Sequence, residues 1–486
     1  MTYDEEYKIW QKDPEKYWEI KAQNIIWNKK WDAVLEKSRT PFWKWFPGAE
    51  LNTCYNCLDF HINNGKGNKT ALIYDSPVTG QKKYFTYNDL LKKTARIAGA
   101  LQSFGVKKGD RVLIYMPMIP EAVCSMLACA RLGAIHVVVF GGFAPNELAT
   151  RIDDSKPKVV IAGSCGIEPG KIIEYKPMLD KALELSTHKI KTCFIFQRPE
   201  KTADMKKGRD HDLENLIQIS DPASPVSVKS DDPLYILYTS GTTGNPKGVL
   251  YAHRSTIVHS LAAAAPDNLN VSARDVVMPV APMFHANSWG IPYVATMAGA
   301  KLVLPGRHLD GESVHSLITK ESVTLTAAVP TIWLMLFEYL EKSGESLDSL
   351  DRCMIGGSAC PRSMMEIFKK KYGVTVIHGW GMTETSPLGA INTPLAKHSY
   401  MSIDELLDLS EKQGRPMYGV ELRITDDKGK VLPNDGKAFG DLWIKGPWIC
   451  SGYMNIKNSE VHRKDGWFMT GDVATIDTDG YMHITD

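Results

Sequence analysis

Short apolar runs alternate with amphipathic segments along most of the chain. The runs RVLIYM (111–116), HVVVF (136–140) and KVVIAG (158–163) are rich in β-branched residues and have the length of buried strands. Between such runs, segments like 85–105 place apolar residues at helical spacing, and Gly105 provides a stop signal. This alternation predicts parallel sheets that are covered by helices on both faces.

A second series of the same kind runs through 276–281, 300–306, 323–330, 352–357 and 374–381. After about residue 415, shorter alternating runs are separated by the turn signals DKGK (427–430) and TDG (478–480), which predict β-hairpins. The first 70 residues are rich in tryptophan and favour a cap on a larger body. We therefore expect an α/β fold: a helical cap at 1–70, α/β subdomains at 71–230 and 231–412, and a β-rich subdomain at 413–486.

Composition narrows the class of protein. The 57 basic and 56 acidic side chains balance, so no net field favours nucleic acid or a membrane surface. No uninterrupted apolar run reaches the ~20 residues of a membrane helix, and the start MTYDEEYKIWQKD is polar, so we expect a cytoplasmic protein. Nine scattered cysteines favour reduced thiols, and Cys54 and Cys57 lack the second pair that a zinc site needs, so packing is the favoured interpretation.

The densest chemical signal is YTSGTTGNPKG (238–248). It is not a Walker loop, because Pro246 precedes Lys247, Gly248 follows it, and an apolar run on each side predicts two strands rather than a strand and a helix. The glycines let backbone N–H groups approach phosphate oxygens, and the hydroxyls and the lysine add donors and charge. A phosphate-binding hairpin tip is therefore favoured over an idle surface loop.

This segment resembles the signature loop of the acyl-adenylate-forming superfamily, which includes acyl-CoA synthetases, luciferases and peptide-synthetase adenylation domains. Three further motifs support the resemblance: GGSA (356–359), GWGMTET (379–385) and TGD (470–472), in the order found in that family. The resemblance covers the chain from about residue 70 to 486. It implies that ATP and a carboxylic acid give an acyl-AMP, and that Mg²⁺ and coenzyme A take part.

The resemblance also implies roles for individual residues. Thr383, Glu384 and Lys247 would be catalytic, with Glu384 holding Mg²⁺ and Thr383 contacting the α-phosphate. The phosphates of ATP would be held by Thr239, Ser240, Gly241, Thr242, Thr243, Gly244 and Lys247. The adenine and ribose would be held by Gly357, Ser358, Ala359, Gly379, Trp380, Gly381 and Asp472. Trp380 could instead be a core aromatic, and Asp472 a turn residue.

Two branches of the family are visible in one chain. The front half resembles acetyl- and propionyl-CoA synthetases, which implies a CoA site at Phe140, Gly141, Gly142 and Lys171, although Glu168 stands where that branch tends to have arginine. From about residue 250 the chain resembles medium- and long-chain fatty acyl-CoA synthetases, which implies an acyl pocket at His285, Trp289, Val329 and Gly381.

The residue after Trp380 bears on the length of the acid, because the short-chain enzymes of the family have a second tryptophan after the adenine-side aromatic. Here Gly381 follows Trp380, which predicts room for several methylenes and a medium-chain or longer acid.

Several alternatives stay open. The chain stops at GYMHITD, where the family continues into a hinge and a small C-terminal domain, so we expect that domain to be absent and activity to be impaired. The competing functions are a short-chain ligase, an adenylation module that serves a carrier protein, a luciferase-type oxidase and a non-catalytic nucleotide-binding fragment. The two-branch pattern fits a natural mosaic or an engineered chimera. Homodimerisation is implied by family likeness alone.

Overall fold

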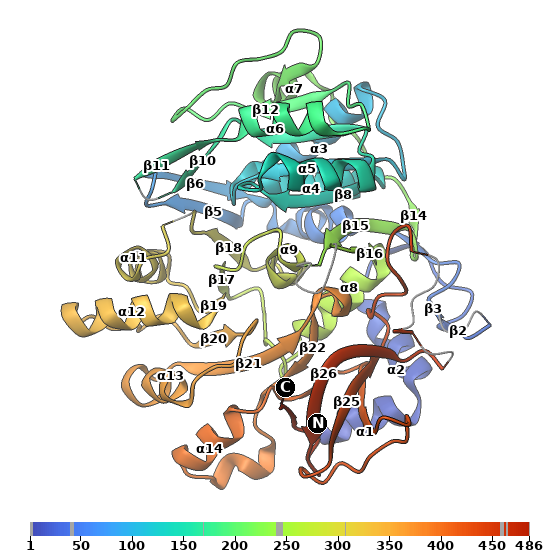
Figure 1. Ribbon diagram of the computed structural model, residues 1–486, viewed down its shortest axis with the longest axis vertical. Helices are drawn as coiled ribbons and strands as arrows, with labels where there is room; N and C mark the ends of the chain where they lie inside the picture. The colour runs from blue at the N-terminus through green and yellow to red at the C-terminus, as the bar shows by residue number, and fades with distance from the viewer. Residues whose placement is uncertain are drawn as a thin grey trace.

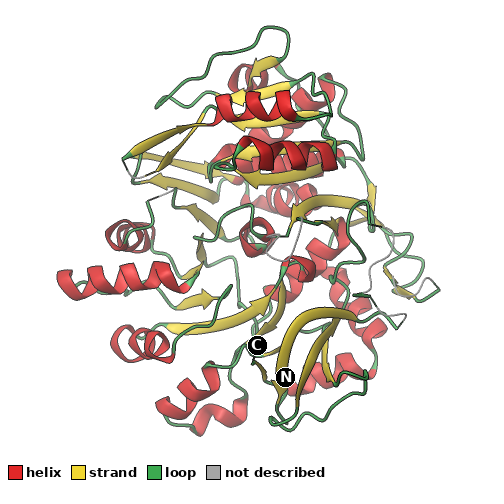
Figure 2. Cartoon of the chain, in the orientation of Figure 1, coloured by secondary structure: helices red, strands yellow, loops and turns green. Residues whose placement is uncertain are grey.

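The structure is a computed structural model that describes residues 3–38, 43–168, 170–239, 246–306, 308–456, 461–462 and 465–485. Two large sheets and one small sheet form the body, and helices lie on the faces of the large sheets (Figures 1 and 2). This confirms the predicted α/β class with parallel-containing sheets. No helix in the described part of the chain combines the length and the apolar character that a membrane crossing requires.

The first large sheet has the strand order β13-β12-β9-β7-β8-β15-β16. All neighbouring pairs are parallel except β15 and β16, which form an antiparallel hairpin. The strands are β7 (Arg111–Met116), β8 (Ile135–Phe140), β9 (Val159–Gly163), β12 (Cys193–Phe196), β13 (Asp210–Asp212), β15 (Pro233–Tyr238) and β16 (Gly248–Ala252). The strand–loop–strand arrangement predicted around residues 238–248 is therefore confirmed.

Helices pack on both faces of this sheet, as their apolar positions predict. On one face lie α5 (Pro145–Ser155) and α6 (Tyr175–Leu185), which share a core with the sheet. On the other lie α3 (Tyr87–Ser103), α4 (Pro120–Leu132) and α7 (Leu213–Ile219). The sequence sets the start of α3, because Thr86 and Asp89 form a reciprocal capping box.

The second large sheet has the order β23-β22-β21-β20-β19-β17-β18-β5-β6, and its neighbours from β21 to β5 are parallel. Its strands are β5 (Thr70–Ser76), β6 (Gln81–Thr86), β17 (Val276–Pro279), β18 (Lys301–Leu304), β19 (Leu325–Ala328), β20 (Arg352–Ile355), β21 (Thr375–Gly381), β22 (Leu388–Ile391) and β23 (Arg415–Pro416). The associated helices are α8 (His253–Ala263), α9 (Ala286–Trp289), α10 (Ile291–Ala298), α11 (Gly311–Glu321), α12 (Pro330–Ser343), α13 (Arg362–Glu366) and α14 (Ile403–Ser410).

The two large sheets exchange strands across the predicted boundary near residue 230. β5 and β6 come early in the chain but pair with β18 of the second sheet. β15 and β16 come after the boundary but pair with β8 of the first sheet. Local hydrophobic patterns predict that a segment is a strand, but they do not specify its partner, so the exchange was not visible in the sequence.

The third sheet is antiparallel, with the order β24 (Glu421–Thr425), β25 (Phe439–Lys445), β26 (Phe468–Ile476) and β27 (Met482–Ile484). The TDG turn joins β26 to β27 as predicted, with Gly480 at positive φ. The hairpin predicted across DKGK is present but short: Thr425 and Val431 form an antiparallel bridge, Asp426 N–H donates to Lys430 O at 3.0 Å, and Leu432 N–H donates to Ile424 O at 2.9 Å. The full ladder of β24 is formed with β25, which supplies buried Leu442 and Ile444.

Only part of the predicted cap is helical. α1 (Tyr3–Lys12) and α2 (Pro14–Lys21) are followed by short strands, and the helical character returns after residue 52. These strands are β1 (Trp27–Lys29), β2 (Leu35–Glu36), β3 (Lys44–Trp45) and β4 (Glu50–Leu51), and β14 (Val228–Lys229) pairs with β4. Short helical turns elsewhere are η1 (Ala22–Asn24), η2 (Tyr55–Asp59), η3 (Ile62–Lys66), η4 (Ile367–Lys371), η5 (Thr383–Thr385) and η6 (Ala396–Tyr400). Cys54 and Cys57 are fully buried in the core.

A fully buried indole of the cap packs beside the third sheet. Trp18 of α2 is 1% exposed, and its ring meets Trp448 edge to face at 6.1 Å. A Cβ placed on Gly419 would stand 2.4 Å from Cζ2 of Trp18, so only glycine leaves room for this contact. Figure 1 shows α1 and α2 beside β25 accordingly.

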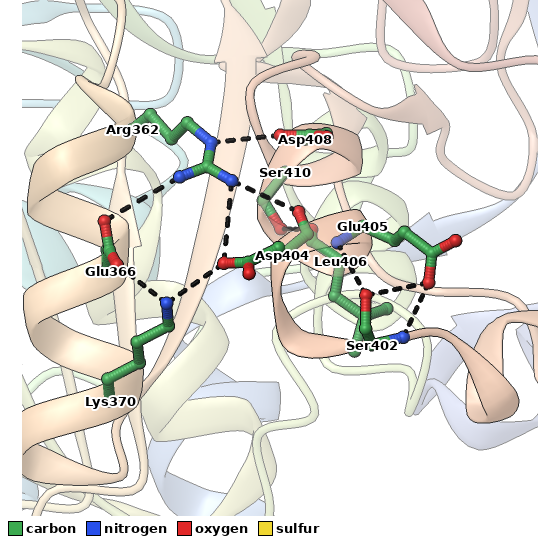
Figure 3. Close-up of polar contacts among 9 residues, drawn as sticks. All are labelled: Arg362, Glu366, Lys370, Ser402, Asp404, Glu405, Leu406, Asp408 and Ser410. Atoms are coloured by element: carbon green, nitrogen blue, oxygen red, sulfur yellow. Dashed lines mark hydrogen bonds and ion pairs between the residues drawn. The ribbon is translucent and has the colours of Figure 1, made fainter.

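Helix α14 is fastened to the second sheet by both charge and apolar burial. Arg362 donates to Asp408 at 3.0 Å, and Lys370 lies 3.0 Å from Asp404, in the network of Figure 3. These pairs are exposed to solvent, so each contributes little to stability. Burial of Leu407 and the contact of Ser410 O with His378 Nδ1 at 3.1 Å hold the helix beside β21. β21 leads directly into the site described below.

We expect Trp18→Ala to destabilise the protein by about 3–5 kcal/mol, because a fully buried indole leaves a cavity that the sheet cannot fill. Denaturant unfolding followed by circular dichroism measures the change. The matched control is Ile20→Ala on the same helix, which removes a side chain that is 55% exposed and should change stability by less than about 0.5 kcal/mol. Equal effects of the two substitutions would show that the cap is not packed through Trp18.

Candidate active site

Parallel strands of both large sheets end at one cleft. The cleft has a volume of about 1150 Å³ and is lined by residues at or just after the carboxyl ends of β8, β15, β20 and β21. The carboxyl ends of parallel strands are where ligands bind in open α/β sheets. The third sheet closes the cleft with the segment 468–472 of β26. Three regions far apart in sequence therefore meet in a single cavity.

Lys247 lies at the base of the glycine-rich hairpin and lines the cleft together with Thr239. The backbone N–H of each residue donates to the other, from Thr239 to Lys247 O at 3.0 Å and from Lys247 to Thr239 Oγ1 at 3.0 Å. These bonds close the hairpin and leave the exposed Lys247 side chain on the cleft. The other predicted phosphate holders, Ser240, Gly241, Thr242, Thr243 and Gly244, lie outside the described residues.

Glu384 is the only carboxylate among the described cleft residues whose side chain is almost fully buried. Its Oε1 accepts a hydrogen bond from the Tyr453 hydroxyl at 2.8 Å, and its carbonyl accepts one from the Cys450 N–H at 2.8 Å. The ammonium of Lys247 lies 5.1 Å from the centre of the Tyr453 ring. Burial raises the pKa of Glu384 above its ordinary value, and the Tyr453 bond and the Lys247 charge offset this only in part.

Thr383 lines the cleft beside Glu384, and its backbone is fixed from behind. The hydroxyl of Tyr251 donates to the carbonyl of Thr383. Tyr251 stacks on Tyr235 at 4.1 Å, so the contact rests on the core of the first sheet. The short turn that carries Thr383 and Glu384 is thus held between the first sheet and the segment after β25.

Asp472 and Trp380 form a pair in which the indole N–H donates to Asp472 Oδ2 at 3.1 Å. Asp472 lines the cleft, and burial raises its pKa above the ordinary value. Trp380 is 7% exposed and does not line the cleft, because its ring packs over Gly389, where a Cβ would stand 2.4 Å from Cζ3. The structure thus places Trp380 behind Asp472, as a core aromatic that orients the carboxylate.

The remaining adenine-side residues form an open shelf. Gly357 and Gly379 line the cleft, while Ser358 and Ala359 are exposed just beyond it. A Cβ on Gly357 would stand 3.6 Å from Cζ2 of Trp289 and 3.5 Å from Cγ1 of Val329. The shelf therefore borders the predicted acyl pocket directly, although Val329 does not itself line the cleft.

The predicted acyl residues His285 and Trp289 both line the cleft, on a strained turn. Ala286, Asn287, Ser288 and Trp289 all have positive φ, between 41° and 57°. Each such non-glycine residue costs of order 1 kcal/mol or more, and this kind of strain gathers at functional sites. The Ser288 hydroxyl, which donates to Ala281 O, helps to hold the turn and aims the indole of Trp289 at Gly356 and Gly357.

Gly381 lines the cleft, but the reason for its lack of a side chain differs from the one predicted. A Cβ on Gly381 would stand 2.0 Å from the carbonyl oxygen of Pro387. The backbone of Pro387 occupies the space that we expected to be open for methylenes. Gly381→Trp is therefore a poor test of chain length, because it would displace the neighbouring strand.

The predicted CoA residues do not line the cleft. A Cβ on Gly141 would stand 2.5 Å from Cε2 of Tyr175, and one on Gly142 would stand 2.6 Å from Cε1 of Phe140. Close ring packing therefore accounts for both glycines. Lys171 is exposed on the hairpin of β10 (Cys165–Glu168) and β11 (Lys171–Glu174), opposite Glu168.

Several residues of the cleft were not predicted from the sequence, among them Tyr453 and Arg151. Tyr453 carried no local signal, because it meets Glu384 only through the fold. Arg151 could have been found, since it follows Glu147 by four residues on a helix that begins at Pro145. Its guanidinium lies 2.8 Å from Glu147 Oε2 and 4.2 Å from the centre of the Phe143 ring.

The sequence model of the AMP-binding enzyme family matches residues 60–454, and that of the acetyl-coenzyme A synthetase N-terminus matches residues 3–57. The chain therefore belongs to the AMP-binding enzyme family. This confirms the resemblance drawn from the loop and the three later motifs.

Relatives of two kinds match. The chain is 55% identical over 251 residues to a 3-methylmercaptopropionyl-CoA ligase of Ruegeria lacuscaerulensis, covering 52% of this chain and 46% of that protein. It is 54% identical over 259 residues to a medium-chain-fatty-acid–CoA ligase of Ectopseudomonas oleovorans, covering 53% and 47%. It is 35% identical over 498 residues to human acyl-CoA synthetase short-chain family member 3, covering 97% and 70%.

The chain thus spans about half the length of the first two relatives. One kind of relative matches about half of this chain at higher identity, and the other matches almost the whole chain at lower identity. This difference agrees with the two branches of the family seen in the sequence. These coverages do not confirm the expectation that a C-terminal domain is missing.

Glu384→Gln should stabilise the protein near pH 7, because it removes a buried charge and keeps an acceptor for Tyr453. A carboxyl whose folded pKa is raised loses stability as pH rises from its ordinary value of 4.5 through the folded value. The advantage of glutamine should therefore be full above the folded pKa, shrink as pH falls from there toward 4.5, and be absent below 4.5. Denaturant unfolding at both pH values measures it. The control is Glu338→Gln at an exposed position, whose free energy of unfolding should stay within about 0.5 kcal/mol of wild type at both pH values. An effect of Glu384→Gln that does not depend on pH would contradict the raised pKa of Glu384.

Proposed function

We propose that the protein is an ATP-dependent carboxylic acid:CoA ligase that forms an acyl-AMP and pyrophosphate and then an acyl-CoA. One observation carries the proposal: Lys247, Glu384 and Asp472 come from three distant segments and line one cleft. That set matches the needs of the reaction, in which a cation faces phosphates, a carboxylate faces a metal and another faces a ribose. The names of the relatives, all acid–CoA ligases, support it.

In the adenylation step the carboxylate oxygen of the acid attacks the α-phosphorus, the bond to the β-phosphate breaks, and pyrophosphate leaves. Lys247 and the glycine-rich hairpin would hold the β- and γ-phosphates as charge builds on them. Thr383, whose backbone is fixed by Tyr251, would contact the α-phosphate. Asp472 has one oxygen bonded to Trp380 and would offer the other to the ribose hydroxyls.

Glu384 fits a Mg²⁺ site of the kind that relies on substrate phosphates. Mg²⁺ in such sites takes one or two carboxylates and fills its other positions with phosphate oxygens and water. Among the described residues, no group of three His, Cys, Asp or Glu side chains could hold a metal ion by itself. When bound, the ion neutralises phosphate charge. A buried carboxylate opposed only by Tyr453 and a distant lysine gains most from such an ion.

The acid is proposed to be of medium chain length or longer. Trp289 and His285 border the cleft beside apolar residues of β8 and β22, which suits an alkyl chain. A short-chain acid is the second candidate, since the Pro387 carbonyl fills the space beside Gly381 and a whole-chain relative is named for short chains.

Coenzyme A is proposed as the acyl acceptor because of the relatives' names and the front-half resemblance. Phe140, Gly141, Gly142 and Lys171 remain predictions for its site. Arg151, which lines the cleft, is a further cation that could meet its phosphates. A homodimer and a cytoplasmic location likewise remain predictions.

Adenylation is tested by trapping the acyl-adenylate with hydroxylamine in the presence of ATP, Mg²⁺ and octanoate. We expect hydroxamate from the wild-type chain and a loss of about 10²–10³-fold in Glu384→Gln and Lys247→Met, because each removes stabilisation of phosphate charge. Glu338→Gln and Lys342→Met, on exposed positions of α12, should match wild type. ATP binding without hydroxamate for any acid would falsify the ligase proposal and favour a nucleotide-binding protein.

Chain length is tested with a series of straight-chain acids from acetate to dodecanoate. Each methylene buried in the cleft adds about 0.8 kcal/mol, so kcat/KM should rise roughly fourfold per carbon until the pocket is full. Trp289→Ala should move the optimum to longer acids, because the indole no longer limits the pocket. If acetate or propionate gives the highest kcat/KM, the short-chain candidate replaces the medium-chain one.

A further inference from the structure

The carboxylate of Asp154 joins two segments that lie far apart in the sequence. Its Oδ2 accepts from the Tyr238 hydroxyl at 2.8 Å, and its Oδ1 accepts from Nδ2 of Asn455 at 2.8 Å. Asp154 belongs to α5, Tyr238 ends β15, and Asn455 lies between β25 and β26. We call these three side chains the Asp154 clamp.

One arm of the clamp leads to Lys247. Tyr238 is followed directly by Thr239, whose N–H donates to Lys247 O and whose hydroxyl accepts from the Lys247 N–H, each at 3.0 Å. Burial raises the pKa of Tyr238, and the bond to Asp154 raises it further, so this hydroxyl stays protonated near pH 7. Asp154 therefore holds the strand end from which the glycine-rich hairpin starts.

The other arm of the clamp leads to Glu384. Two residues before Asn455, the Tyr453 hydroxyl donates to Glu384 Oε1 at 2.8 Å. The backbone between them is attached to the first sheet by the Met454 N–H, which donates to Gly248 O at 2.7 Å. The clamp bond attaches the same segment a second time, through α5.

The backbone of Asn455 indicates that this contact is built into the fold. Its φ is 60°, in the left-handed region that asparagine tolerates better than most residues. A residue held there carries strain that the surrounding contacts must offset. Nδ2 of Asn455 also lies 3.3 Å from Asp154 O, so one amide contacts both the carboxylate and the backbone of Asp154. Bonds to an ionised acceptor are stronger than those between neutral groups.

We propose that Asp154 is a positioning residue for the adenylation step, an inference that rests on the ligase function proposed above. Neither Asp154 nor Asn455 lines the cleft, so they act through the residues that do. The cation Lys247 and the carboxylate Glu384 come from different segments, and the clamp fixes both segments to one helix. A displacement of about 1 Å between groups that stabilise one transition state can lower a rate by about 10²-fold.

The test compares kcat and KM for ATP of the full chain in the hydroxylamine assay. Asp154→Ala removes the carboxylate, and Asn455→Gly removes the amide without straining the positive φ. We expect each to lower kcat at least about tenfold and to change KM for ATP by less than about threefold, because misplacement affects the transition state more than binding. In the protein without substrates, the Met454 amide should exchange hydrogen several-fold faster in both variants.

Asp153→Ala is the matched control on the same helix. The carboxylate of Asp153 accepts from the Ser186 hydroxyl at 2.5 Å and from the His188 N–H at 2.8 Å, and none of these residues lines the cleft. Its loss should destabilise α5 without changing kcat. A loss of kcat equal to that of Asp154→Ala would reveal a general effect of an unstable helix and would overturn the proposal.

A reciprocal exchange tests the bond itself. Asn455→Asp alone places two carboxylates together and should lower kcat as Asn455→Gly does. Adding Asp154→Asn restores a donor for one partner and an acceptor for Tyr238, so kcat should recover to within about threefold of wild type. Circular dichroism establishes which variants fold, and Asn455→Gly decides if the others do not.

The possible outcomes separate this proposal from the ligase proposal. Unchanged kcat or unchanged exchange in Asn455→Gly, or no recovery in a folded double variant, overturns the positioning role while wild-type hydroxamate upholds the ligase. If the wild-type chain forms no hydroxamate with any acid, the ligase proposal fails, and the positioning role fails with it.

Discussion

The site depends on a constraint of the backbone: parallel strands of two different sheets must end at the same cleft. That alignment is achieved because the sheets exchange strands, with β5 and β6 extending the second sheet and β15 and β16 closing the first. The antiparallel β15–β16 hairpin at the edge of an otherwise parallel sheet places Thr239 and Lys247, at its base, on the cleft. β20 and β21 supply another wall of the cleft.

Sequence patterns predicted much of this architecture where the information was local. Buried runs, the capped helix α3 and the TDG turn are all encoded within a few neighbouring residues. What could not be predicted depends on partners far away in sequence: β5 pairs with β18, and β15 pairs with β8, across the boundary near residue 230. The site shows the same division. Motifs identified Lys247, Glu384 and Asp472, but only the fold reveals Tyr453, and only packing explains Gly141 and Gly381.

The glycines of the motifs show that a residue can lie at the predicted site for a different physical reason from the one its motif suggests. Gly381 is flanked by Trp380 and lines the cleft, yet it is glycine because the Pro387 carbonyl lies where a Cβ would stand. Trp380 in turn packs over Gly389 and aims its N–H at Asp472. These contacts act in the core and in the site at once. A substitution at any of them disturbs the packing and the carboxylate together, which limits what single mutants at this strand can resolve.

A small cavity of about 190 Å³ beside the cap shares a wall with the main cleft. The segment 447–453 has Cys450 and Pro447 beside the small cavity, whereas Tyr453 lines the main cleft, and Phe468 borders both. Along that segment, the Cys450 N–H donates to Glu384 O and the Tyr453 hydroxyl donates to Glu384 Oε1. Arg254 Nη1 donates to the Pro447 carbonyl, so α8 holds the same segment that contacts Glu384 at two points. The cap, which matches a family of N-terminal segments, packs on this segment through the contact of Trp18 with Trp448.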